Sequence, residues 1–295
     1  MHGRSPTNYA GDFNTISNSD FNSGTRLFQA WYGRGADWGD WKIGQLALDD
    51  DFMTSDYADL FINAGFGPMP TQSANVAAPI WPIGGLGAHA RVDISHTSSL
   101  QFGLYDGDAG NFASNDDGLN NSLDPRVGYM LVIEYARSTD ALGGQTGWKL
   151  GGYHHTGKEF LHQQNGAKKR GLSSLYTVID HKFSKTFGLW VRFGASQNEE
   201  ISTVSSHVDG GMVFSGPFPS RPDDHIGIGL LRTKFSDDYL NGTPNVSDHE
   251  SVMELTYHAP LYENFHIQPD IQWIFNSHES KDDVFVLGLR FGIEY

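Results

Sequence analysis

The final segment of the chain, residues 283–295, alternates strictly between two kinds of side chain. One set is apolar and comprises Phe285, Leu287, Leu289, Phe291, Ile293 and Tyr295. The other is mostly small or charged and comprises Val284, Val286, Gly288, Arg290, Gly292 and Glu294. Successive residues of a strand point to opposite faces, so this pattern predicts a strand with one wholly apolar face. Such a strand fits the lipid-facing wall of a closed barrel or the edge of a soluble β-sandwich.

Composition narrows the class of protein without deciding between those two folds. The net charge of −15 argues against a nucleic-acid partner, whose phosphates need a basic surface. Cysteine is absent, which excludes disulfides and thiolate metal sites. The longest run without charged residues, 60–90, is broken by four prolines and cannot form a membrane-spanning helix.

Strand-like segments recur along the whole chain, separated by clusters of Gly, Asn, Asp, Ser and Pro. The pattern predicts an all-β fold. Its strands are expected at 25–34, 40–48, 86–95, 99–106, 126–137, 146–155, 172–182, 187–196, 208–216, 224–235, 249–258, 263–275 and 283–295. Residues 54–62 are expected to make one or two helical turns capped by Thr54 or Ser55. Pro269 predicts a bulge in its strand, since proline cannot donate a ladder hydrogen bond.

Two features favour a barrel over a sandwich. The polar face of the predicted strands repeatedly carries charged or amide side chains beside glycine, which suits a water-filled lumen. The connections are also unequal, some as short as 183–186 and others as long as 53–85. Transmembrane barrels combine tight turns at one end with long loops at the other. The sequence therefore favours a transmembrane antiparallel β-barrel formed by residues 1–295 as a single domain.

No enzyme motif is found. The chain has no Gly-x-Ser-x-Gly, no His-Glu-x-x-His and no phosphate-binding glycine loop, so we expect no catalytic residues, no cofactor and no metal. The acidic triplet Asp49, Asp50 and Asp51 precedes an aromatic, proline-rich loop. Carboxylates there could bind sugar hydroxyls while rings such as Trp31, Trp41, Tyr57, Phe61, Phe66 and Trp81 stack on the sugar. For each ring taken singly, a packing or interface role is the more common one.

An ordered set of motifs resembles the carbohydrate-selective porins. The motifs are the segments 11–18, 26–32, 44–52, 55–58, 60–67, 79–82 with Gly87, 152–157, 216–224 and 267–274. The resemblance implies an outer-membrane channel of a Gram-negative bacterium for passive diffusion of mono- and oligosaccharides. It implies a sixteen-stranded barrel, an even number as in bacterial barrels generally. Implied partners are small sugars and outer-membrane lipid with lipopolysaccharide, and the implied assembly is a monomer or homotrimer.

The resemblance also directs attention to lumen residues. Loop 53–85 is expected to fold into the lumen and form the constriction, with contacts to solute from Arg26, Gln29, Trp31, Asp49, Asp51, Trp81 and Arg91. Expected along the lumen wall are Arg192, Gln268, Asp270, Gln272 and Arg290. Each charged residue could instead be a structural partner that ties neighbouring strands.

Three departures from the family pattern stand out. Gln29 occupies a position where the family usually has Glu, and the last residue is Tyr295 where Phe is usual. Thirteen predicted strands also fall short of sixteen, and no signal peptide follows Met1, so we expect that the first strands are missing or that the barrel closes at fourteen. The alternative function is that of a soluble or surface-attached β-sandwich that binds glycans, and such a protein would stay in solution without detergent.

Overall fold

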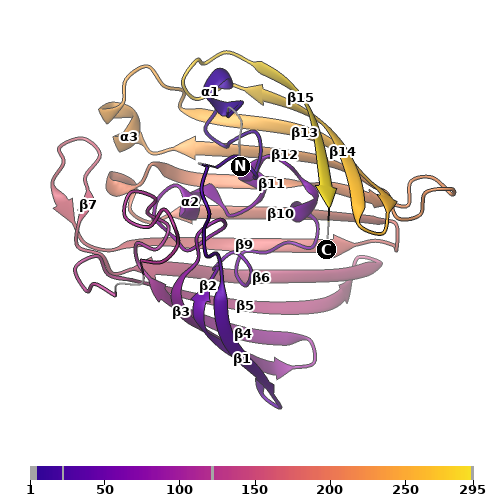
Figure 1. Cartoon of the computed structure of the whole chain (residues 1–295), viewed down its shortest axis with the longest axis horizontal. Coiled ribbons are helices and arrows are strands. Elements are labelled where there is room, and N and C mark those ends of the chain that lie inside the picture. The colour runs from indigo at the N-terminus through magenta and orange to yellow at the C-terminus, as the bar shows by residue number, and fades with distance from the viewer. Residues whose placement is uncertain (1–4, 22, 121–122, 294–295) are drawn as a thin grey trace.

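In the part of the chain that the structure describes, thirteen strands form one antiparallel sheet, and each pairs with the strands of this sheet that precede and follow it in the chain (Figure 1). The computed structural model describes residues 5–21, 23–120 and 123–293. The strands are β1 (Ala30–Ala36), β2 (Gly39–Leu46), β3 (Gly85–Ser95), β4 (Ser98–Asp106), β5 (Tyr129–Ala141), β6 (Gly144–His155), β9 (Leu172–Lys182), β10 (Phe187–Ser196), β11 (Val204–Ser215), β12 (His225–Phe235), β13 (His249–Tyr262), β14 (Phe265–Phe275) and β15 (Val284–Ile293).

Short elements decorate the connections between these strands. A separate two-stranded hairpin, β7 (Phe160–Leu161) with β8 (Lys168–Lys169), lies between β6 and β9. The helices are α1 (Thr7–Ala10), α2 (Pro70–Ser73) and α3 (Asp237–Gly242), with 3-10 turns at Ala58–Leu60, Ala64–Phe66 and Glu199–Ile201. Within the described residues, no helix is long and apolar enough to cross a membrane.

The connections differ by end of the sheet. At one end the connections are turns of two to four residues at 37–38, 96–97, 142–143, 183–186 and 263–264, together with the longer connection 216–224. At the other end they include 47–84, 107–128, 156–171 and 236–248. Tight turns at one end and long connections at the other are typical of outer-membrane barrels, in which the long loops face the outside. We call the two ends the short-turn end and the long-connection end.

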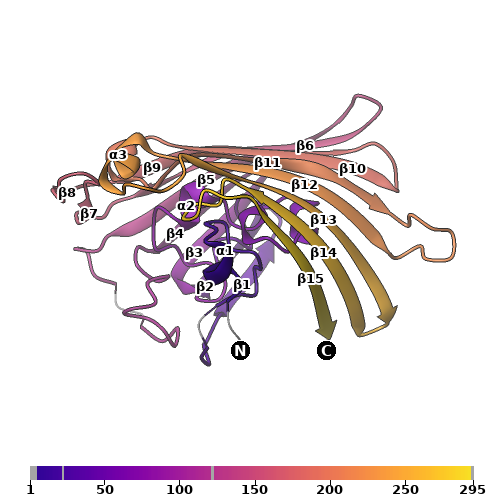
Figure 2. The same cartoon turned by 90° about the horizontal axis from the view of Figure 1, so that it is seen from above.

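The sheet curves around the N-terminal segment and the connection between β2 and β3 (Figure 2). Its edges within the described residues are β1 and β15. Both edge strands run from the long-connection end toward the short-turn end, because β1 leads into turn 37–38 and β15 follows connection 276–283. Two strands that run in the same direction cannot pair as antiparallel neighbours. The free edges of β1 and β15 could be joined in an antiparallel barrel only through an odd number of additional strands.

The convex face of the sheet is apolar, as the closing strand predicted. Along β15 the side chains of Phe285, Leu287, Leu289, Phe291 and Ile293 are 58–72% exposed, and the residues between them are less exposed. Exposed Leu131, Ile133, Leu150 and Leu175 continue this face on the other strands. The concave face carries the polar members of the alternation. Glu294 and Tyr295 lie outside the described residues.

The predicted strands are confirmed, with differences at their ends. The strand expected at 25–34 begins only at Ala30, because Leu27 is bonded outside the ladder: its N–H donates to Asp117 and its carbonyl accepts from the side chain of Gln45. Of the helix expected at 54–62 only a 3-10 turn forms. The Ser55 hydroxyl accepts from the main-chain N–H groups of Tyr57 and Ala58, as a cap does.

The expected bulge at Pro269 is wrong. Pro269 keeps regular register with Leu289. The register between β14 and β13 shifts only between Pro260 and Tyr262, beside turn 263–264. The missing N–H at Pro269 is therefore accommodated without an inserted residue.

The interior of the curved sheet is packed with side chains of the β2–β3 connection. Phe61 and Phe66 are buried against Trp190, with ring centroids 4.8 Å and 6.2 Å from the indole. Gly229 on β12 makes room for them, since a Cβ there would lie 2.7 Å from Phe61 and 2.8 Å from Phe66. Gly227 on the same strand is similar, since its Cβ would lie 2.8 Å from Phe61, so these two glycines of β12 serve close packing against the connection.

Candidate functional site

Carboxylates of the concave wall hold the main chain of the β2–β3 connection. Glu254 on β13 accepts from the N–H groups of Ile62 at 2.7 Å and Asn63 at 2.9 Å. Glu134 on β5 accepts from the N–H of Met53 at 3.0 Å. Asp180 on β9 accepts from the hydroxyl of Ser55 at 2.5 Å. The three carboxyl groups lie on three different strands, so each fixes a different point of the connection.

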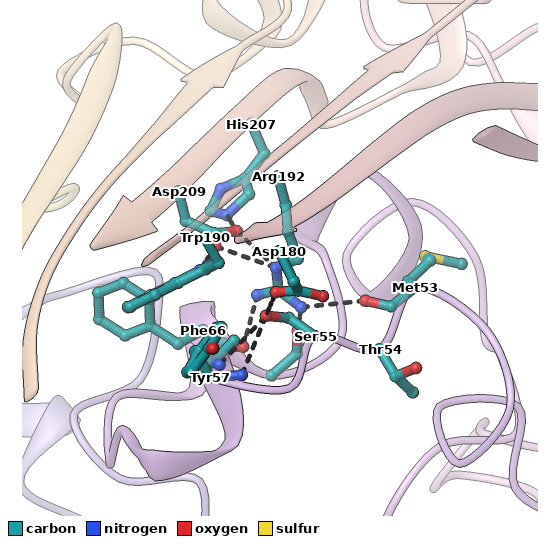
Figure 3. Close-up of polar contacts among 12 residues, drawn as sticks. Met53, Thr54, Ser55, Tyr57, Phe66, Asp180, Trp190, Arg192, His207 and Asp209 are labelled. Atoms are coloured by element: carbon teal, nitrogen blue, oxygen red, sulfur yellow. Dashed lines mark hydrogen bonds and ion pairs between the residues drawn. The ribbon is translucent and has the colours of Figure 1, made fainter. Parts of the chain in front are cut away.

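Arg192 on β10 is the cationic counterpart of these carboxylates (Figure 3). It is 2% exposed, and its Nε donates to both carboxylate oxygens of Asp209 on β11 at 3.0 and 3.1 Å. Its terminal nitrogens donate to the carbonyl oxygens of Phe66 at 2.5 Å and Gly67 at 2.9 Å. Asp209 also accepts from the indole of Trp190 at 2.8 Å. One buried ion pair therefore joins two wall strands to the connection.

The N-terminal segment is held against the wall by strands β13 to β15. Glu250 accepts from the N–H groups of Phe13 at 2.8 Å and Asn14 at 2.9 Å. Gln272 donates to the carbonyl of Ile16 at 2.8 Å, and Arg290 donates to Asn18 at 2.6 Å. Both the segment and the connection thus occupy the concave side and narrow the space that it encloses.

A cavity of about 840 Å³ remains between these two inward segments at the long-connection end. Its lining includes Asp20, Asp49, Asp59, Phe21, Trp81 and Phe112. The rings of Phe21 and Trp81 meet edge to face at 4.5 Å, and Phe21 stacks on Phe112 at 6.4 Å. The cavity, which we call the vestibule, therefore combines aromatic faces with carboxylates.

Asp49 is the most perturbed group of the vestibule. Its Oδ2 accepts from the N–H of Trp81 at 3.3 Å. Burial raises the pKa of Asp49 to about 7, and the neighbouring charge of Asp50 acts in the same direction. Its charge consequently changes near neutral pH. Burial also raises the pKa of Asp59, in this case against the lowering effect of Arg192 and Lys149.

The predicted constriction residues fall into three places. Asp49 and Trp81 line the vestibule, and Arg26 lies beside it with its guanidinium 5.4 Å from the centre of the Phe112 ring. Gln29 donates to Asp50 at 2.6 Å. At the start of the sheet, Trp31 lies under the ammonium of Lys42, which pairs with Asp51 at 2.9 Å.

Arg91 lies elsewhere, in the short-turn half of the lumen. It pairs with Asp40 at 2.8 Å and with Asp93 at 3.4 Å, and its side chain is 44% exposed. A second cavity of about 390 Å³ is lined there by Arg91, Asp93, Lys149 and Lys182. This second cavity and the vestibule have no lining residue in common, so they are distinct cavities of the lumen.

The predicted wall residues all contact the inward segments or each other. Arg192, Gln272 and Arg290 do so as described. Gln268 donates to the carbonyl of Leu60 at 2.7 Å, and Asp270 accepts from Gln272 at 2.9 Å. The alternative of a structural partner thus describes the observed contacts of these residues.

Several residues of the site were missed by sequence reasoning. Glu134 lies on the polar side of a predicted strand, but nothing local indicates that its partner is the main chain of Met53, 81 residues away. Phe21 and Phe112 come from segments without regular periodicity. No group of three or more potential metal ligands is found among the described residues.

A curved antiparallel sheet with an apolar convex face, a polar concave face and an inward-folded connection defines an outer-membrane porin. Comparison with known proteins gives the family. The model of the carbohydrate-selective porin, OprB family, matches residues 1–295, and the chain belongs to that family. Its members are outer-membrane β-barrel proteins of Gram-negative bacteria, so the predicted localisation and fold class are confirmed. The β-sandwich alternative is not supported.

Individual relatives are distant in sequence. The chain is 25% identical to the putative porin QuiX of Acinetobacter baylyi, over 92% of this chain and 69% of the relative. It is 24% identical to Porin B of Pseudomonas aeruginosa, over 80% of this chain and 60% of that protein. The high-pH structure of Pseudomonas putida OprB superposes with a TM-score of 0.84 at 18% identity, over 96% of this chain and 77% of that one.

Proposed function

We propose that this protein is a porin for passive diffusion of mono- and oligosaccharides, and that the vestibule is where the solute is selected. The observation that carries the proposal is the main-chain contact of Trp81 with Asp49. The carboxylate of Asp49 accepts from the main-chain N–H of Trp81, Trp81 is 38% exposed, and both residues line the vestibule. Aromatic faces pack against the apolar faces of a sugar ring, and carboxylates accept from its hydroxyl groups.

The inward connection 47–84 acts as the constriction in this proposal. Its attachment to Glu134, Asp180, Arg192 and Glu254 supports a fixed pore size, since each anchor lies on a different wall strand. Selection in such a channel depends on pore width and on the groups that line it rather than on a chemical step. The protein has no catalytic role in this proposal.

Single-channel recording in planar bilayers tests the proposal. Maltose or glucose added to the bath should block the current, and Trp81→Ala should raise the half-blocking concentration about three- to tenfold, the effect of one aromatic contact. Trp273→Ala is the matched control: Trp273 is exposed to a similar degree, its ring stacks on that of Phe275 with centroids 5.3 Å apart, and it lines neither lumen cavity. Absence of block and of sugar-driven liposome swelling in the wild-type channel would reject sugar diffusion.

A further inference from the structure

The second cavity of the lumen, of about 390 Å³, takes no part in the solute selection proposed for the vestibule. Asp56 and Tyr57 of the inward connection line it, together with side chains of β3 to β6 and β9. The Tyr57 ring packs on β10, where a Cβ added at Gly188 would overlap it. The cavity therefore holds an aromatic ring in a fixed place on the short-turn side of the constriction.

The wall of this cavity has a hollow at Gly147 on β6. A Cβ added there would meet no atom within 4 Å, although the residue lines the cavity. Gly147 is the register partner of Asp180 on β9, and the next inward pair toward the short-turn end is Gln145 with Lys182. Lys149 lies one inward position toward the other end. The missing side chain therefore leaves room for a group of a solute between two lysines.

These two lysines keep their charge available to a solute. Among the described residues, the ion pairs of the lumen wall include neither Lys149 nor Lys182. Lys149 donates to the carbonyl oxygen and the hydroxyl of Thr54 at 2.7 and 2.6 Å, and an ammonium group has three N–H donors. Lys182 is exposed, and Arg137 also lines the cavity. The lining thus presents cationic donors that are not neutralised by a carboxylate.

The carboxylates of the cavity are engaged in contacts of their own. Asp93 pairs with Arg91 at 3.4 Å. Asp180 accepts from the hydroxyl of Ser55 at 2.5 Å and from the N–H of Asp56 at 3.4 Å (Figure 3). Four basic residues and three aspartates line this cavity, whereas the described lining of the vestibule has three aspartates and no lysine or arginine. The two sides of the constriction therefore differ in charge.

We propose that this cavity is a second solute site of the channel and that it takes sugar acids, which carry a carboxylate on a polyhydroxylated ring or chain. The carboxylate lies at the Gly147 hollow between the ammonium groups of Lys149 and Lys182, and the apolar face of the sugar lies on Tyr57. Hydroxyl and amide side chains of the lining bind the sugar hydroxyls: Ser95, Ser98, Ser99, Ser138 and Gln145. The site has this role only if the protein is a sugar channel, as proposed above.

Block of single-channel current by gluconate, glucose and glucosamine tests the site, in about 0.1 M KCl so that charges within about 10 Å still interact. Gluconate should block the wild-type channel at a lower concentration than glucose does. Lys182→Glu should raise the half-blocking concentration of gluconate about tenfold or more, because repulsion replaces attraction. Lys185→Glu is the matched control, since it makes the same change of charge in turn 183–186 outside the cavity. Equal effects of the two variants, or stronger block by glucosamine than by gluconate, would overturn the proposal.

A second variant, Gly147→Leu, addresses the hollow. Because the space around its Cβ is open, the protein should keep its heat-modifiable gel mobility, while the half-blocking concentration of gluconate rises about threefold or more as the new side chain occupies the carboxylate position. Unchanged block by gluconate in this folded variant would reject the site.

Glucose separates the failure of this site from the failure of sugar diffusion. If glucose neither blocks the wild-type channel nor swells liposomes, sugar diffusion itself is rejected, and with it the role of the second cavity as a sugar site. If glucose blocks the channel but the block by gluconate does not depend on Lys182, the sugar-acid site alone is overturned.

Discussion

The guanidinium of Arg192 on β10 donates a hydrogen bond of 2.9 Å to the carbonyl oxygen of Gly67, a residue 125 positions earlier in the chain. The same side chain is paired with buried Asp209. Its position thus couples the wall of the sheet to the connection that fills the lumen. Removing it should affect both stability and pore geometry.

Arg192→Met is expected to destabilise the protein by about 3–5 kcal/mol, because it leaves the carboxylate of Asp209 buried without its cationic partner. Guanidinium unfolding in detergent measures this. The freed connection should also give a larger and noisier single-channel conductance. Arg91→Met is the control, since its exposed ion pairs contribute at most about 1 kcal/mol. Equal destabilisation by both variants would contradict the anchoring role.

The strands of this fold could be predicted from the sequence because the signal is local. In β15 apolar residues alternate with small or polar ones, so the sequence alone assigns each residue to a face of the sheet. The predicted ends of β9 and β10 agree with the observed ends. The site was less accessible. Trp81 and Asp49 could be selected as an aromatic residue and a carboxylate in one loop, but their contact depends on how that loop turns back. The pairing of Arg192 with Asp209 depends on the register between β10 and β11. Its hydrogen bonds to the carbonyls of Phe66 and Gly67 depend on contact between segments more than a hundred residues apart in the chain.

Gly229→Val should be strongly disfavoured by overpacking. A Cβ at this position would lie 2.7 Å from Phe61 and 2.8 Å from Phe66, so the rings must move. We expect a loss of about 1–3 kcal/mol in the free energy of unfolding. Gly147→Val is the matched control: Gly147 is also a strand glycine, and nothing lies within 4 Å of its added Cβ. If the two variants unfold alike, Gly229 is not needed for the fit of the connection.

Asp12→Asn should stabilise the protein at pH 8 and lose this advantage toward pH 4. Burial, with a contribution from the charge of Glu250, raises the pKa of Asp12 from its ordinary value to about 7. The folded state therefore binds more protons than the unfolded state between about pH 4 and 7, and stability falls as pH rises through this window. Asparagine removes the cost of the buried charge, about 4 kcal/mol at pH 8, because the pKa is raised from 3.8 to about 7. Thermal unfolding in detergent at both pH values measures it; an equal difference at pH 4 and pH 8 would contradict the assignment to Asp12.

The charge of Asp49 should make the ion selectivity of the channel depend on pH near neutrality. Its pKa is raised to about 7 by burial and by Asp50, so the carboxyl is mainly neutral at pH 6 and mainly ionised at pH 8. An added negative charge in the vestibule attracts cations, and the preference for cations over anions should therefore increase with pH. Reversal potentials in a KCl gradient measure this preference. Asp49→Asn should abolish most of the increase, whereas Asp140→Asn, which removes a carboxylate at a short turn, should retain it. An undiminished increase in the Asp49 variant would assign the titration to another group of the lumen.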